Sequence, residues 1–323
     1  MSDAILNAGV AAVLAELGMD GDPPALTPLP GGASRQTFLV EAAGRSLVLR
    51  RDPPGSRSFS PLSLEVAVIQ AAAAAGVPVP HTLRFEPDGG RFVSAGVLME
   101  RVEGTSVGPR LLRRDEYGAA RAMLPGQLAA ALAGIHSVDP AAIHELSSIP
   151  EDPAIAACEL WEAALDEWEH PQPALEAGLR WLRLNAPAPG PASLVHGDFR
   201  LGNFIASERG LEAVIDWELC HAGDPAEDLA WICVRSWRFG NDALPVAGMG
   251  LREDFLDAYE AAGGRRPDDA RLRWWEVLGN VKWAVICARQ ARDHLTGVRR
   301  SHELASLGRR ICEPEWDLLE LVR

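Results

Sequence analysis

The sequence predicts an α+β protein of two lobes, a small antiparallel sheet followed by a larger, mainly helical part. Short apolar segments separated by turn residues fill the first hundred positions. After Gly104, apolar residues recur at helical spacing. A chain of 323 residues is too long for one small core and suits two lobes. We expect the first lobe to span 1–103 and the second 104–323.

The composition is that of an ordinary globular protein, with 47% hydrophobic and 24% charged residues. A formal net charge of −14 argues against a nucleic-acid partner. No signal peptide opens the chain and no apolar run approaches the ~18 residues of a membrane span. We therefore expect no membrane partner and a cytoplasmic location, while the oligomeric state is left open. The five cysteines show no zinc-ligand spacing and fit a reducing compartment; they are Cys158, Cys220, Cys233, Cys287 and Cys312.

The first lobe begins with an amphipathic segment that predicts a helix over 4–17, which Gly18 can end. A Pro-rich connection and a turn rich in small residues follow. Two segments with strand character then flank a short turn at Ala43-Gly44. In chain order we expect the connection over 20–30, the small-residue turn over 31–34, and strands over 37–41 and 45–51.

A second helix is expected over 61–75, where Leu64, Val68 and Ile69 share one face. Two further strands should follow around a Pro-Asp-Gly-Gly turn, over 80–85 and 91–99. The residues 99–103 would then join the two lobes as a hinge.

The second lobe reads as a series of helices interrupted by one hairpin. Pro125 could divide the helix expected over 117–135. The hairpin pairs a strand starting at Phe204 with a strand over 211–215, and a loop is expected over 220–225. The other expected helices cover 155–170, 174–184, a segment opening at Glu227, 252–262, 271–293 and the residues from His302 onward.

The most informative stretch runs from Leu194 to Trp217. Gly197 marks a tight turn from which Asp198 can project into a cleft. Four residues separate Asp198 from Asn203, and Asp216 ends the returning strand of the hairpin. Two carboxylates and an amide delivered to one point can position a hydroxyl and hold magnesium, which prefers hard oxygen ligands. Phosphoryl-transfer enzymes use the same parts at similar spacing.

The motif HGDFRLGN at 196–203, followed by IDWE at 215–218, resembles the aminoglycoside phosphotransferase-like family. This family is a small-molecule branch of the protein-kinase-like fold. The tripeptide Gly-Asp-Pro at 223–225 and the sequence Asp-Leu-Ala-Trp at 228–231 follow. Together, these motifs are similar to those of the subgroup of kinase domains fused to some acyl-CoA dehydrogenases. The resemblance implies a two-lobe kinase-like fold and transfer of a phosphoryl group from ATP, or GTP, to a small hydroxyl compound.

The resemblance also implies roles for the motif residues. Asp198 would orient the acceptor hydroxyl and take its proton, while Asn203 and Asp216 would bind Mg2+. Arg200 could reach the γ-phosphate, or it could simply anchor the loop. His196 would support the loop around Asp216. Asp228 resembles the buried aspartate that braces the catalytic loop, although a first-turn helix acid would look the same.

Nucleotide-binding residues are expected in the first lobe. Gly31, Gly32 and Ser34 would cover the phosphates, since small residues let backbone N–H groups approach an anion. At the hinge, Glu100 and Val102 would meet the adenine through backbone atoms.

The family places a phosphate-pairing lysine at the end of its third strand, where this chain has Arg50-Arg51. Side chains alternate along a strand, so only one of the two arginines can face the cleft. The Leu-x-Leu-cation pattern of the family favours Arg50. Glu65 would pair with Arg50 and fix its direction. The only lysine of the chain, Lys282, lies in a late helix.

Several alternatives remain open from the sequence. A protein kinase is disfavoured because the segment between Asp216 and the helix near Glu227 is short. The acceptor could be an aminoglycoside, a choline-like amine, a sugar or a hydroxyacyl compound. Aromatic residues could line its cleft; Trp231, Trp237 and Trp283 are the candidates. A nucleotide-binding regulator without turnover is a further alternative.

Overall fold

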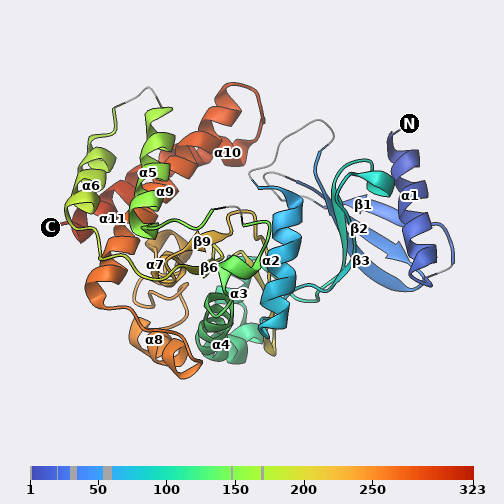
Figure 1. Cartoon of the computed structure of the whole chain (residues 1–323), viewed down its shortest axis with the longest axis horizontal. Coiled ribbons are helices and arrows are strands. Elements are labelled where there is room, and N and C mark those ends of the chain that lie inside the picture. Colours follow the sequence, from blue (N-terminus) through green and yellow to red (C-terminus); the bar gives the residue numbers. More distant parts are fainter. Residues whose placement is uncertain (1, 20, 30–34, 54–59, 147, 169–170) are drawn as a thin grey trace.

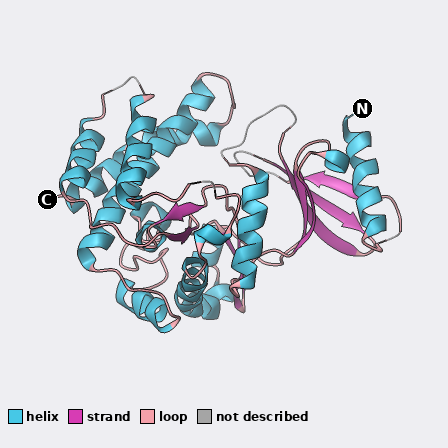
Figure 2. Ribbon diagram, viewed as in Figure 1, coloured by secondary structure: helices cyan, strands magenta, loops and turns pink. Residues whose placement is uncertain are grey.

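The computed structural model describes all residues except 1, 20, 30–34, 54–59, 147 and 169–170. It has two parts, a small sheet with its flanking helices and a larger helical body (Figure 1). The mixed architecture, with strands concentrated at the N-terminal side, is visible in Figure 2. The α+β class predicted from the sequence, with a small antiparallel sheet and a larger, mainly helical part, is confirmed. The division at 103/104 stays a prediction.

A five-stranded antiparallel sheet forms the N-terminal part, in the spatial order β1-β2-β3-β5-β4. Each strand pairs with antiparallel neighbours, and β2 and β3 form a hairpin. The strands are β1 (Ala25–Pro28), β2 (Gln36–Ala42), β3 (Arg45–Arg51), β4 (Thr82–Glu86) and β5 (Gly96–Glu100).

One helix packs on each side of this sheet. The outer helix α1 (Ser2–Glu16) buries Leu6 and Val10 in the same apolar cluster as Leu47 and Leu49 of β3. The helix α2 (Leu62–Ala74) lies between the sheet and the helical body (Figure 1). Because successive strand side chains point to opposite faces, Arg50 projects to the face opposite Leu49.

Two predictions for the first lobe need correction. The strand expected over 91–99 begins only at Gly96, and the 3-10 helix η1 (Gly90–Phe92) precedes it. Positive φ angles at Gly89 and Val93 interrupt an extended path, while Phe92 is fully buried against α1. The connection expected over 20–30 contains β1; its Pro28 is tolerated because β1 is an edge strand.

The helical body contains most of the remaining elements. Its helices are α3 (Gly108–Arg113), α4 (Gly118–His136), α5 (Pro153–Asp166), α6 (Pro173–Leu184), α7 (Ala226–Trp231), α8 (Arg252–Ala261), α9 (Asp269–Leu295), α10 (His302–Leu307) and α11 (Cys312–Leu321), with short 3-10 turns η2 (Asp115–Tyr117), η3 (Pro140–Ala142), η4 (Arg235–Trp237) and η5 (Gly308–Arg310). Among the described residues, no helix is long and apolar enough to cross a membrane.

Two short antiparallel pairs carry the central motif within this body. The strand β6 (Ser193–Val195) pairs with β9 (His221–Gly223), and β7 (Phe204–Ser207) pairs with β8 (Gly210–Val214). The predicted hairpin is confirmed, whereas β9 lies in a stretch that was expected to be a loop. Pairing with β6 stabilises this three-residue strand, which is too short to be recognised from periodicity.

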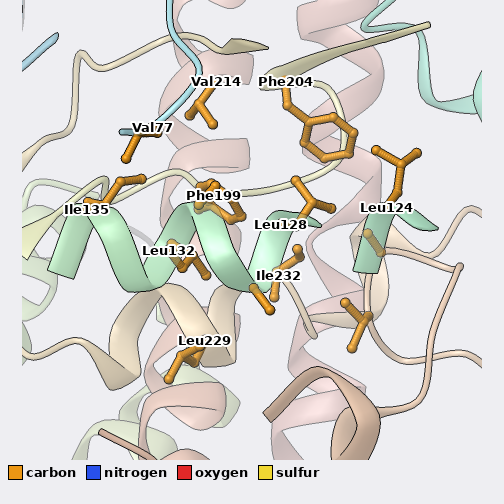
Figure 3. Close-up of a cluster of buried hydrophobic side chains, with 14 of the residues drawn as sticks. Val77, Leu124, Leu128, Leu132, Ile135, Phe199, Phe204, Val214, Leu229 and Ile232 are labelled. Atoms are coloured by element: carbon orange, nitrogen blue, oxygen red, sulfur yellow. The ribbon is translucent and has the colours of Figure 1, made fainter. Parts of the chain in front are cut away.

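The largest apolar cluster lies beneath these pairs. Leu128 and Leu132 of α4 lie in one buried cluster with Phe199 and Phe204, so the central motif is anchored in the core (Figure 3). The helix α4 continues through Pro125, which the sequence suggested could divide it. Buried apolar side chains before and after the proline hold both halves of α4 in one helix, so packing outweighs the lost backbone hydrogen bond.

Candidate active site

The turn that presents Asp198 depends on the glycine before it. Gly197 has a φ of 77°, and a Cβ at this position would overlap the carbonyl oxygen of Leu219. The carboxylate of Asp228 accepts the backbone N–H groups of His196 (2.8 Å) and Gly197 (3.0 Å). These contacts match the bracing arrangement that the motif implied for Asp228.

The charge of Asp228 is supported from behind. Its Oδ2 lies 3.2 Å from Nε2 of His136, whose Nδ1 in turn lies 2.8 Å from the hydroxyl of Tyr259. Burial opposes the charged form, but the hydrogen bond from His136 keeps the pKa of Asp228 below its ordinary value. An ionised acceptor for both turn amides is thereby maintained.

His196 joins the two halves of the motif. Its Nδ1 accepts the N–H of Asp198 at 3.2 Å, so its proton lies on Nε2, which donates to the carbonyl of Ile215 at 3.1 Å. The imidazole is fully buried, and burial lowers the pKa of His196. A neutral ring therefore links the turn of Asp198 to Ile215, the residue before Asp216. Asp216 itself has the unusual φ of 68°.

The carboxylate of Asp198 is nearly surrounded by donors. Its Oδ1 accepts from Nε1 of Trp231 (2.8 Å) and Nε of Arg200 (3.0 Å), while Oδ2 accepts from Nδ2 of Asn203 (2.5 Å). A carboxylate oxygen has about two acceptor sites. The protein thus fills both sites of Oδ1 and leaves one on Oδ2, the oxygen best able to accept a further hydroxyl proton.

Asn203 is oriented by its acceptors. Its amide nitrogen donates to the carboxylate and to the backbone carbonyl of Asp198, so its oxygen points elsewhere. The backbone carbonyl of Asn203 accepts the N–H of Ile215 at 2.9 Å, which brings Asp216 to the same region. An amide oxygen and a carboxylate that is one-third exposed form a hard, sparse donor set. Such a set fits Mg2+, which completes its coordination with phosphate oxygens and water.

Arg50 extends this site into the sheet. Its guanidinium lies 3.4 Å from Asp216 and 3.7 Å from Glu65, whereas Arg51 bonds to Gln36 on the other face. The strand alternation therefore separated the two arginines correctly. The ion pair between Arg50 and Glu65 is present, as the sequence predicted.

A second arginine at Glu65 was missed. Arg35 lies 2.9 Å from Glu65 and 3.3 Å from Asp52, and it donates to the carbonyl of Ser60. Burial raises the pKa of Glu65, although Arg50 and Arg35 act in the opposite direction. Arg35 belongs to no periodic pattern in the sequence. The one signal that could have found it is its position directly after the small-residue turn expected from the sequence.

Arg200 is held by the loop itself. Its guanidinium bonds to Asp198 and stacks over the ring of Trp237 at 4.6 Å. This geometry accounts for the loop-anchoring alternative, and contact with a γ-phosphate stays a prediction. Trp237 contacts Trp231 and Trp283 through tilted and edge-on rings, and all three are more than nine-tenths buried. Their lining of an acceptor cleft also stays a prediction.

The remaining nucleotide contacts are less defined. Gly31, Gly32 and Ser34 lie outside the described residues. The N–H of Glu100 donates to the carbonyl of His81 at 2.9 Å, so its own carbonyl would have to serve a ligand. Val102 lies two residues beyond the end of β5, at the predicted hinge.

Sequence reasoning assigned no role to Lys282, yet this residue reaches the motif. Its ammonium donates to the carbonyl of Gly197, the residue directly before Asp198. The sequence separation of 85 residues explains why no local pattern marked the contact.

The fold and this arrangement of residues define a phosphotransferase of the protein-kinase-like type. The pattern of the phosphotransferase enzyme family matches residues 25–275, and the chain belongs to that family.

Curated relatives support the subgroup resemblance. Acyl-CoA dehydrogenase family member 10 of Mus musculus is 34% identical over 305 residues, covering 88% of this chain and 28% of the relative. Acyl-CoA dehydrogenase family member 11 of Rattus norvegicus is 28% identical over 302 residues, covering 86% of this chain and 38% of the relative. The chain spans about two-fifths or less of the length of these relatives.

Solved structures share the fold. A Ralstonia eutropha protein assigned as an aminoglycoside phosphotransferase superposes with a TM-score of 0.79 at 23% identity, covering 98% of this chain and 97% of that chain. A thermostable variant of aminoglycoside phosphotransferase APH(4)-Ia, in complex with AMP-PNP and hygromycin B, has a TM-score of 0.63 at 18% identity and covers 98% of both chains.

Proposed function

We propose that this protein transfers the γ-phosphoryl group of ATP, or GTP, to a hydroxyl of a small molecule with the help of Mg2+. The observation that carries the proposal is that Asn203 bonds through its side chain to Asp198 and through its backbone carbonyl to Ile215, the residue before Asp216. Nucleotide use is supported by the solved neighbour that binds AMP-PNP.

In the proposed mechanism, the protein mainly positions groups. Asp198 receives the acceptor hydroxyl on Oδ2 and takes its proton, while Trp231 and Arg200 hold Oδ1. Asn203 and Asp216 would supply oxygens for Mg2+, which when bound would neutralise charge on the transferring phosphoryl group. Arg50 neutralises further phosphate charge. A strongly basic carboxylate is unnecessary, since positioning dominates through a loose transition state.

The acceptor class can be narrowed by the charges near Asp198. The carboxylates of Asp198, Glu227 and Asp228 are each paired with a cationic or imidazole side chain of the protein. These paired and buried carboxylates offer no binding site to a polycationic aminoglycoside, and the subgroup resemblance favours a less cationic, more apolar acceptor. The aminoglycoside alternative rests on fold similarity alone.

A non-catalytic regulator is the remaining alternative. Such a protein would have no need for an aspartate with one open acceptor site beside a magnesium-type donor set. The departure from lysine to arginine at Arg50 preserves the positive charge, so it does not favour this alternative.

The test is ADP formation over a panel of hydroxyl compounds: aminoglycosides, choline, sugars and hydroxyacyl compounds. Each reaction is run with Mg2+ and with a chelator, and phosphorylated products are identified by mass spectrometry. We expect at least one Mg2+-dependent product, with Asp198→Ala retaining nucleotide binding and losing transfer. Tight nucleotide binding without a product from the panel or from a metabolite extract would favour the regulator.

A further inference from the structure

The only lysine of the chain is buried next to the catalytic turn. Lys282, in the middle of α9, is 3% exposed. Its ammonium donates to the carbonyl of Gly197 and, at 2.9 Å, to Oε1 of Glu227 in α7. It also lies over the rings of Trp231 and Trp161, 4.6 and 5.6 Å from their centroids. A buried ammonium is tolerated only with such partners, so this site is highly constrained.

The partner carboxylate is equally enclosed. Glu227 is 7% exposed, and its Oε2 lies 3.1 Å from Nε2 of His221 in β9. Burial disfavours its charged form, but Lys282 and His221 together hold the pKa of Glu227 at about 2. The carboxylate is therefore charged at neutral pH, which keeps the ammonium of Lys282 paired.

These contacts fix one particular peptide group. The peptide between Gly197 and Asp198 has its carbonyl bound by Lys282 and its N–H bound by Nδ1 of His196. The preceding two N–H groups are bound by Asp228. The plane of this peptide sets the direction in which the Asp198 side chain leaves the backbone, because the next bond is the N–Cα bond of Asp198.

We propose that Lys282 is a positioning residue of the phosphoryl-transfer site, which holds the Gly197 carbonyl and thereby aims the carboxylate of Asp198. The inference rests on the proposed function for its kinetic consequence, but its structural half is independent of that function. Lys282 does not touch the reacting groups; it acts through the backbone.

The composition of the chain supports a specific need for lysine. Of 31 basic residues, all but one are arginine. A compact ammonium fits among a carbonyl, a carboxylate and two aromatic faces, whereas a planar guanidinium needs a wider, fork-shaped site. In this arginine-rich chain, the single lysine lies where a planar guanidinium would fit poorly.

The test compares Glu227→Gln with the double variant Glu227→Gln/Lys282→Met. Both lack the buried carboxylate, so neither carries the unpaired acid that would threaten folding in Lys282→Met alone. In Glu227→Gln, the side-chain oxygen of the glutamine can still accept from Lys282, so the ammonium keeps a partner there and can still donate to the carbonyl of Gly197. Arg292→Met, an exposed position on the same helix whose guanidinium bonds to the Glu167 carbonyl, controls for general effects on α9.

Two readouts are taken, steady-state kinetics and amide hydrogen exchange of residues 197–199. Relative to Glu227→Gln, we expect the double variant to lose about 10- to 100-fold in kcat, with KM for the nucleotide within about twofold. Exchange at 197–199 should be faster in the double variant and unchanged in Arg292→Met.

The outcomes separate the inference from the proposed function. Unchanged exchange, or faster exchange with unchanged kcat, would overturn the positioning role. A rise in nucleotide KM matching the fall in kcat/KM would also overturn it, since the effect would then be on binding. If the wild-type protein transfers no phosphoryl group, the proposed function fails, and the exchange result alone decides whether Lys282 holds the turn.

Discussion

The two arginines at Glu65 should differ sharply in what their loss costs. The Glu65 side chain is 1% exposed and has Arg35 at 2.9 Å and Arg50 at 3.7 Å. Arg35 is as buried as Glu65, whereas Arg50 is 17% exposed and also faces Asp216. We predict that Arg50→Met impairs catalysis with little loss of stability. Arg35→Met should instead lower the free energy of unfolding strongly and affect catalysis less.

The structure provides the expected sizes. Removing one partner of a buried pair typically costs about 3–5 kcal/mol. Arg35→Met should fall at the lower end, about 3 kcal/mol, because Arg50 still faces Glu65. Arg50→Met should cost about 1 kcal/mol or less in stability, because Arg35 continues to compensate the acid. Loss of a charge-assisted contact to phosphate, about 1.5–3 kcal/mol, should lower kcat/KM by about 10- to 150-fold.

The assay pairs urea unfolding with nucleotide kinetics on the same preparations. Arg50→Lys is the matched control, since it keeps the charge and should recover part of the lost kcat/KM. Equal destabilisation by Arg50→Met and Arg35→Met would refute the assignment of Arg35 as the main counter-charge. Unchanged kcat/KM in Arg50→Met would refute the phosphate role of Arg50.

Three further predictions concern the catalytic turn. Gly197→Ala should destabilise the protein by at least about 2 kcal/mol, because the position has a positive φ and the added Cβ would clash with Leu219. The control Gly44→Ala, which has a positive φ but open space around it, should cost only about 1–2 kcal/mol. Urea titration measures both losses, and equal losses would contradict the clash. Burial lowers the pKa of His196 from 6.5, so the native ring stays neutral at a pH where the unfolded chain takes up a proton. The free energy of unfolding should therefore fall as the pH drops from about 6.5 to 5. This group contributes at most about 1.4 kcal/mol per pH unit to that fall. His196→Asn should lack that component of the slope, and an identical slope in the variant would argue against a neutral buried imidazole. Asp198→Asn should bind nucleotide normally by calorimetry and lose about 10²-fold or more in transfer, and near-normal turnover would exclude Asp198 as the proton acceptor.

Local features of the site were predictable from the sequence. Asp198 and Asn203 are five residues apart around a glycine turn, so their meeting is a matter of short-range geometry. The hairpin that brings Asp216 back was marked by two short apolar segments joined by a turn at Glu208-Arg209-Gly210. Strand alternation predicted that Arg50 and Arg51 lie on opposite faces, and the Leu-x-Leu-cation pattern of the family favoured Arg50 for the cleft.

Contacts over long sequence distances were not predictable where the family resemblance did not imply them. Trp231 donates to Asp198 across 33 residues, and Lys282 reaches Gly197 across 85. Nothing in the spacing of an indole or an ammonium within its own helix indicates which distant turn it will meet. The same limit explains the three-residue strand β9, which exists only because β6 lies beside it.

Irregular local segments were the second source of error. The apolar run over 91–99 contains a buried Phe92 and several strand-forming residues, so it resembles one continuous strand. The backbone at Val93 nevertheless adopts a positive φ, which a β-branched residue seldom does. Packing of Phe92 against α1 outweighs that local preference.

The central claim is that Asn203 and Asp216 hold a divalent cation against a nucleotide, and one titration tests it without knowledge of the acceptor. Binding of the non-hydrolysable analogue AMP-PNP is measured calorimetrically with and without Mg2+, for the wild-type protein and for Asp216→Asn. We predict that Mg2+ tightens binding to the wild type by about tenfold or more, equivalent to about 1.4 kcal/mol, and has little effect on the variant. The same Mg2+ enhancement in both proteins would contradict the claim.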